Sequence, residues 1–118
     1  MNARGGLVIA LVTAANEAQA VSIARTLVKE QLAACVNIVG QVRSVYRWRG
    51  EIQEDREHLM VIKTRRLLLA KLERRVKELH SYEVPEVIAL SVAAGSRAYL
   101  DWIAESTASK AARRKTRR

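Results

Sequence analysis

The side chains of this chain that could do chemistry begin with one thiol and two imidazoles. Cys35 lies in a small apolar stretch from Ala33 to Val36, and His58 and His80 are far from it in the sequence. A thiol with an imidazole could act as nucleophile and base, and it could equally bind a soft ion such as Cu(I) or Zn(II). Free cysteine is also among the most buried residue types, so a purely structural thiol is the third interpretation.

A metal site would need further ligands beside the thiol. Glu83 and Glu86 are candidate carboxylates, and together with Cys35 and His80 they offer sulfur, nitrogen and oxygen donors. The spacing does not form a closed tetrahedral set within one chain, but a symmetric oligomer would multiply every ligand around its axis. His80 also falls at the C-terminal end of a predicted helix, where an imidazole could simply interact with the last carbonyls.

A second group of residues suggests an anion or a subunit contact. Lys63 interrupts an apolar strand and therefore needs a carboxylate or an anionic ligand, with Glu57 on the same strand face as one candidate. An ion pair at a subunit interface would satisfy it as well. Tyr46 and Trp48 could stack on a ligand, but aromatic side chains on a projecting hairpin are also typical interface anchors.

Catalysis is not indicated. The chain has no nucleophile elbow, P-loop, dinucleotide fingerprint or Cys/His zinc cluster, so we predict a protein that is not an enzyme and has no obligatory cofactor. Its 118 residues suit one domain, and a single cysteine excludes an internal disulfide, as expected in a cytoplasmic protein. No apolar run approaches the roughly 20 residues that span a bilayer, so we expect no membrane partner.

The net charge of +9 first suggests an anionic partner such as nucleic acid. Most of it is concentrated in residues 106–118, which carry +6, whereas residues 1–105 carry 15 basic and 12 acidic side chains. We therefore predict a folded domain over 1–105 and a basic, disordered tail over 106–118. The tail lacks aromatic residues for base stacking, so nucleic-acid binding would be weak and confined to it.

Hydrophobic spacing predicts the elements that position these side chains. The expected elements are a buried central strand at 7–12, a helix near 16–32, strands from 33 to 48 and from 52 to 64, a helix near 66–80, a strand at 87–92 and a short helix around Leu100. Asn16 is a good N-cap, Gly40 marks a bend or bulge, and Arg49-Gly50 forms a two-residue turn. The order βαββαβ followed by a helix is that of an α+β, ferredoxin-like sandwich.

The hairpin around Arg49-Gly50 is too long for its domain. About 15 residues at roughly 3.3 Å each reach about 50 Å, whereas a domain of this size is about 35 Å across. Its tip should therefore overhang and expose aromatic surface, which predicts a homo-oligomer.

Several stretches taken together resemble the CutA divalent-cation tolerance family. They are Leu11-Val12-Thr13, Ile23 to Val28, Leu32 to Ile38, Ser44 to Ile52, Ile62-Lys63-Thr64, His80 to Val87 and Tyr99 to Ile103. They occur in order over roughly residues 7–103, so the resemblance is specific although each fragment alone would be weak. Two departures are Ser81 and Ala15, where the family often has proline.

The resemblance implies a cytoplasmic homotrimer that is linked to tolerance of copper and other divalent ions and has no established reaction. It implies metal candidates at Cys35 and His80, and from the ligand chemistry above we add Glu83 as the carboxylate. It implies an intersubunit cleft at Tyr46, Trp48, Glu57, Lys63, Tyr82 and Glu86. The alternative is a PII-like trimeric sensor or scaffold that binds a small anion through Lys63 and signals to a partner protein.

Overall fold

The computed structural model describes residues 6–108 and contains one four-stranded sheet with three α-helices. The elements are β1 (Leu7–Ala14), α1 (Glu17–Lys29), β2 (Cys35–Trp48), β3 (Glu51–Arg65), the 3₁₀ helix η2 (Arg66–Leu68), α2 (Leu69–Leu79), β4 (Ile88–Ser91) and α3 (Arg97–Ser106). This order confirms the predicted α+β, ferredoxin-like βαββαβ fold with a long hairpin and a C-terminal helix. No helix within residues 6–108 is long and apolar enough to cross a membrane.

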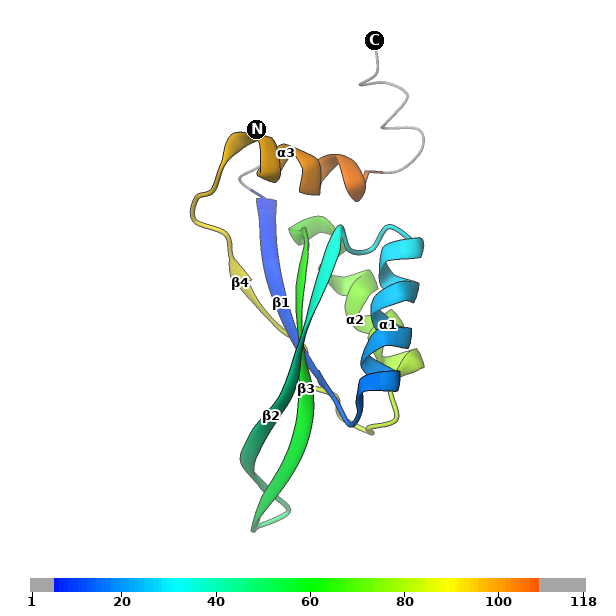
Figure 1. Ribbon diagram of the computed structural model, residues 1–118, viewed down its shortest axis with the longest axis vertical. Helices are drawn as coiled ribbons and strands as arrows, with labels where there is room; N and C mark the ends of the chain where they lie inside the picture. The colour runs from blue at the N-terminus through cyan, green and yellow to red at the C-terminus, as the bar shows by residue number, and fades with distance from the viewer. Residues whose placement is uncertain (1–5, 109–118) are drawn as a thin grey trace.

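The sheet has the strand order β2-β3-β1-β4, and all neighbours are antiparallel. The unbroken apolar run of β1 predicted a central strand, and β1 indeed lies between β3 and β4. Figure 1 shows α1 and α2 side by side on one face of this sheet, while α3 crosses its end near the start of β1.

The main core lies between the sheet and α1 and α2. Alternate residues of β1 and β3, such as Ala10, Val12 and Ile62, face the helices and are fully buried. The opposite face of the sheet, which we call the outer face, carries the residues in between. Its apolar members are Ile9, Leu11, Val39, Leu59, Val61, Ile88 and Leu90, of which Val39, Ile88 and Leu90 are exposed.

Local signals set the ends of the helices. The Asn16 side chain accepts a hydrogen bond from the Gln19 amide at 2.8 Å, which confirms it as the N-cap of α1. The helix ends at Lys29, three residues before the predicted end, because Gln31 adopts a left-handed conformation with φ of 61°. At the other end of the chain the Ser96 side chain caps α3 by accepting from the Tyr99 amide.

The hairpin of β2 and β3 projects beyond the helices (Figure 1), and the long axis of the molecule measures 55 Å against 26 and 23 Å for the others. Trp48 pairs with Glu51, so Arg49 and Gly50 form the predicted two-residue turn, both with positive φ. The register shifts between Val39 and Val42, which places a bulge at the predicted bend beside Gly40.

Candidate functional site

A hollow of about 780 Å³ opens beside the outer half of the hairpin, where the segment after α2 passes next to it. Five of the six residues that the resemblance implied for a cleft line it, namely Tyr46, Trp48, Glu57, Tyr82 and Glu86. Glu83, Asp55 and Arg49 line it as well. Its lining thus includes four carboxylates and a single guanidinium, and we call it the acidic cleft.

Glu57 is the buried carboxylate of the acidic cleft, with 7% of its surface exposed. It comes from β3 and accepts a hydrogen bond from the Tyr82 hydroxyl at 2.7 Å. Burial, and then the hydrogen bond to Glu57, raises the pKa of Tyr82 well above its usual range, so the phenol stays protonated and can donate. The pair fixes the segment after α2 against the hairpin.

A second phenol and carboxylate lie further out along the hairpin. The Tyr46 hydroxyl donates to Asp55, and this bond raises the pKa of Tyr46. At the turn, the Arg49 guanidinium lies 5.6 Å from the centroid of the Trp48 ring and 3.6 Å from a carboxylate oxygen of Glu83. Arg49 is therefore the positive group of the cleft.

The acidic cleft has four carboxylates and one guanidinium, and the excess of negative charge affects the pKa of Glu86. Burial raises the pKa of Glu86, and the negative charge of Glu57 raises it further. A cation placed between these two groups would lower the energy of both charged forms. The electrostatics of the cleft therefore favour a positively charged ligand over an anion.

Lys63 and Cys35 lie apart from the acidic cleft. They form a cross-strand pair at the other end of the outer face, where the Lys63 ammonium donates to the Asn37 side chain and lies 3.9 Å from the Cys35 sulfur. Glu57, the carboxylate suggested for Lys63, instead accepts from Tyr82. Lys63 thus cannot hold an anion in the cleft, and Cys35 is half-buried rather than fully buried.

His80 is buried at the C-terminal end of α2, and both of its ring nitrogens are used by the backbone. Nδ1 accepts from the Tyr82 amide at 3.1 Å, so Nε2 carries the proton and donates to the Thr13 carbonyl at 2.7 Å. No lone pair is left for a metal ion. The imidazole positions the segment after α2 instead, with its ring 4.6 Å from that of Tyr82.

The predicted metal set of Cys35, His80 and Glu83 is therefore not brought together within one chain. Cys35 is beside Lys63, His80 is inside the fold and Glu83 is at the rim of the acidic cleft. Over the part of the chain that the structure describes, no three His, Cys, Asp or Glu side chains are grouped closely enough to hold an ion. A tight site would need carboxylates to move together or a second copy of the chain to add ligands.

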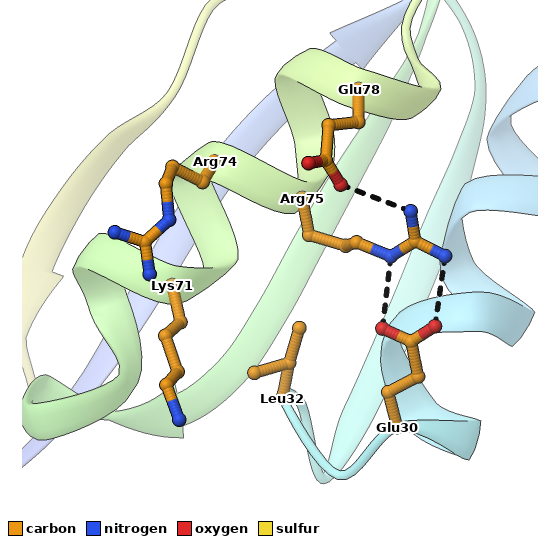
Figure 2. Close-up of a pocket in the computed structure, with 6 residues that line it drawn as sticks. All are labelled: Glu30, Leu32, Lys71, Arg74, Arg75 and Glu78. Carbon is orange, nitrogen blue, oxygen red and sulfur yellow. Dashed lines mark hydrogen bonds and ion pairs between the residues drawn. The ribbon is translucent and has the colours of Figure 1, made fainter.

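A second hollow, of about 270 Å³, lies between α2 and the end of α1 and contains none of the predicted site residues. In Figure 2 the Arg75 guanidinium reaches across it and makes two hydrogen bonds of 2.9 Å to Glu30 and one of 3.1 Å to Glu78. The bond from Arg75 lowers the pKa of Glu30. This arrangement fixes the two helices to each other and explains the hollow without a ligand.

Sequence reasoning missed Asp55 and Arg49 as members of the acidic cleft. Asp55 pairs with Ser44 across the hairpin and lies diagonal to Tyr46. Counting back from the predicted turn at Arg49-Gly50 would have given this register. Arg49 was interpreted only as a turn residue, because nothing local indicates that its side chain folds back over Trp48. The basic tail, Lys110 to Arg118, lies outside the described residues.

Comparisons with known proteins agree with this architecture. The model of the CutA1 divalent ion tolerance protein family matches residues 8–106. The divalent-cation tolerance protein CutA of Thermus thermophilus is 52% identical over 99 residues, which cover 84% of this chain and 96% of that protein. The chloroplastic CutA of Arabidopsis thaliana is 47% identical over 100 residues, covering 85% of this chain but 55% of that longer protein.

Solved structures match equally well. The structure of the Thermus thermophilus protein has a TM-score of 0.85 at 50% identity, covering 86% of this chain and 99% of that one. The periplasmic CutA of Archaeoglobus fulgidus has a TM-score of 0.84 at 35% identity, with 86% and 99% covered. As predicted, the family is one of non-enzymatic proteins. The fold, the hairpin and these matches together place the chain in the CutA1 divalent ion tolerance protein family.

Proposed function

We propose that the protein acts in divalent-cation tolerance as a non-enzymatic homotrimer that binds metal ions, copper or other divalent cations, for sequestration or signalling. The observation that carries the proposal is the acidic cleft, in which four carboxylates face one guanidinium although the chain as a whole is strongly basic. Carboxylate oxygens suit divalent cations. Family membership supports the same function.

Within this proposal the metal candidates divide by chemistry. Glu83 and Glu86 would bind hard or borderline divalent ions at the rim of the acidic cleft, with Glu57 behind them. Cys35 would bind a soft ion such as Cu(I) through its sulfur, which lies 3.9 Å from the Lys63 ammonium. His80 is no longer a candidate because its lone pair is engaged.

The outer face of the sheet supports the homotrimer. Ile88 and Leu90 are 55% and 56% exposed there, and Val45 and Ile52 on the hairpin are 62% and 70% exposed. Exposed apolar side chains in this number are typical of a protein interface, and other copies of the chain would cover them. A cytoplasmic location remains a prediction, since the relatives above include chloroplastic and periplasmic proteins.

Calorimetric titration of the full chain with Zn(II) and Cu(II) tests the metal proposal. We expect Glu83→Gln combined with Glu86→Gln to weaken binding at least about tenfold, since two charged ligands are lost. Glu54→Gln is the matched control, because Glu54 is a hairpin carboxylate that pairs with Arg43 outside the cleft. Unchanged affinity in the double variant would contradict the proposal. The PII-like alternative is not favoured, since Lys63 lies outside the cleft.

A further inference from the structure

The end of the molecule that carries α3 is the end to which the basic tail is attached. Figure 1 shows α3 across the start of β1, at the opposite end of the long axis from the hairpin turn. Leu7 of β1 packs there with Leu100 and Ile103 of α3 in a separate small core. Ala108, the last described residue, follows this helix, so the tail continues from here, away from the acidic cleft.

Two arginines of the folded domain belong to the same end, and together with α3 they form what we call the α3 end. Arg66 follows β3, whose last residue Arg65 pairs with Leu7, and its guanidinium donates to the Ser91 hydroxyl at 2.6 Å. Arg97 is the first residue of α3, where the positive end of the helix dipole adds to its charge. Both side chains are exposed, and no carboxylate within residues 6–108 forms an ion pair with either.

The net charge at the α3 end comes chiefly from the tail. Asp101 and Glu105, the carboxylates of α3, offset the two arginines, whereas residues 106–118 carry +6 without one acidic side chain. The carboxylates of the acidic cleft lie beside the outer half of the hairpin, at the far end of the chain's long axis. The charge of the α3 end is therefore available to an anionic partner.

The composition of the tail favours a phosphate polymer over a lipid surface as that partner. Its cations are four arginines and two lysines, and arginine forms paired hydrogen bonds with phosphate oxygens. Residues 109–118 contain no aromatic or large aliphatic side chain, which an interfacial segment would insert among lipids. The same composition provides no base stacking, so the contacts would be to phosphates and independent of base sequence.

We propose that the α3 end docks the phosphate backbone of nucleic acid, with the tail arginines as the main contacts and Arg66 and Arg97 as further contacts on the folded domain. Such contacts release counterions, so the affinity falls steeply with salt and corresponds to a Kd of roughly 1–100 μM at physiological salt. This inference goes beyond the proposed function, since it uses neither the acidic cleft nor a metal ion.

Fluorescence anisotropy of the full chain with a labelled oligouridine of about 20 nucleotides, over a salt series, tests the proposal. Replacing the four tail arginines by glutamine should weaken binding at least about tenfold at about 50 mM salt. It should also lower the salt slope by up to about 3, because each phosphate contact to a single strand contributes about 0.7. The four substitutions are Arg113→Gln, Arg114→Gln, Arg117→Gln and Arg118→Gln.

A matched pair of double variants tests the folded part of the α3 end. Arg66→Gln with Arg97→Gln should weaken oligouridine binding at least about threefold at about 50 mM salt. Arg47→Gln with Arg56→Gln removes the same charge from exposed positions of the hairpin and should change the affinity less than about twofold. An equal loss in the two variants would show that net charge alone matters and would contradict a docking surface at the α3 end.

Two further outcomes would overturn the inference. One is the absence of oligouridine binding by wild type at about 50 mM salt, or an unchanged affinity in the four-arginine variant. The other is binding to phosphatidylserine vesicles without binding to oligouridine, which would assign the tail to a lipid surface. Zn(II) titration of the four-arginine variant should match that of wild type, so failure of this inference and failure of the metal proposal are distinguishable.

Discussion

The Nε2 atom of His80 lies 2.7 Å from the carbonyl oxygen of Thr13, so this imidazole connects the end of α2 to the end of β1 inside the fold. It also accepts from the Tyr82 amide, which directs the following segment toward the hairpin. His80, which the family resemblance implied as a metal ligand, therefore stabilises the fold through these two backbone hydrogen bonds. The acidic cleft depends on it indirectly, because Tyr82, Glu83 and Glu86 all follow it.

His80→Ala should lower the free energy of unfolding by about 2–4 kcal/mol, since it leaves a buried carbonyl and amide without partners and opens a cavity. Denaturant unfolding measures this. His80→Gln can restore one of the two hydrogen bonds and should recover part of the loss. Equal stability of wild type and His80→Ala would show that the two backbone bonds contribute nothing.

Tyr82→Phe should lower the free energy of unfolding by about 1–3 kcal/mol, because Glu57 is 7% exposed and would lose the hydroxyl that donates to it. Tyr46→Phe is the matched control. Its partner Asp55 is exposed and can turn to water, so the loss should be smaller. Thermal unfolding of the two variants side by side measures the difference, and an equal loss would contradict the buried role of Glu57.

Glu86→Gln should raise the melting temperature at neutral pH. The folded protein raises the pKa of Glu86 above its ordinary value of 4.5, so ionisation of this group costs stability as pH rises through the folded pKa. As pH falls through the ordinary value of 4.5 the carboxyl becomes protonated in the unfolded state as well as in the folded state, and the advantage of glutamine should shrink. Melting curves from pH 4 to 8 test this, and a variant that is less stable than wild type at pH 7 would refute it.

Leu90→Lys should break the proposed trimer. Leu90 is 56% exposed on the outer face, and a charge there cannot be buried against another copy without a partner. Sedimentation should give about three times the chain mass of 13.2 kDa for wild type and a smaller species for the variant. Leu67→Lys is the control, since Leu67 is 82% exposed and belongs to η2 rather than to a strand of the sheet. A wild-type protein that sediments as a monomer would contradict the trimer proposal.

Most of the fold followed from local signals. The apolar run of β1, the cap at Asn16 and the turn at Arg49-Gly50 each act within a few residues, so the sequence could predict them. The predicted end of α1 was three residues too late. The helix stops before Gln31, which adopts a left-handed conformation although it is not a glycine, so the sequence contained no sign of this stop. Glutamine rarely adopts that conformation.

The site was predictable only in part, for a similar reason. Tyr46, Trp48 and Glu57 share one hairpin, and the resemblance placed Tyr82 and Glu86 beside them. The positions of the Lys63 and His80 side chains depend on hydrogen-bond partners that are distant in the sequence, namely Asn37 for Lys63 and Thr13 for His80. Such partners become visible only when the sheet register and the path of the segment after α2 are known.

The central claim, that the acidic cleft binds divalent cations, is tested most directly by anomalous scattering from crystals of the protein soaked in Zn(II). The account predicts an anomalous peak beside the carboxylates of Glu83 and Glu86, within the cleft that Glu57 backs. Peaks confined to other parts of the molecule, with the cleft empty at saturating Zn(II), would contradict it.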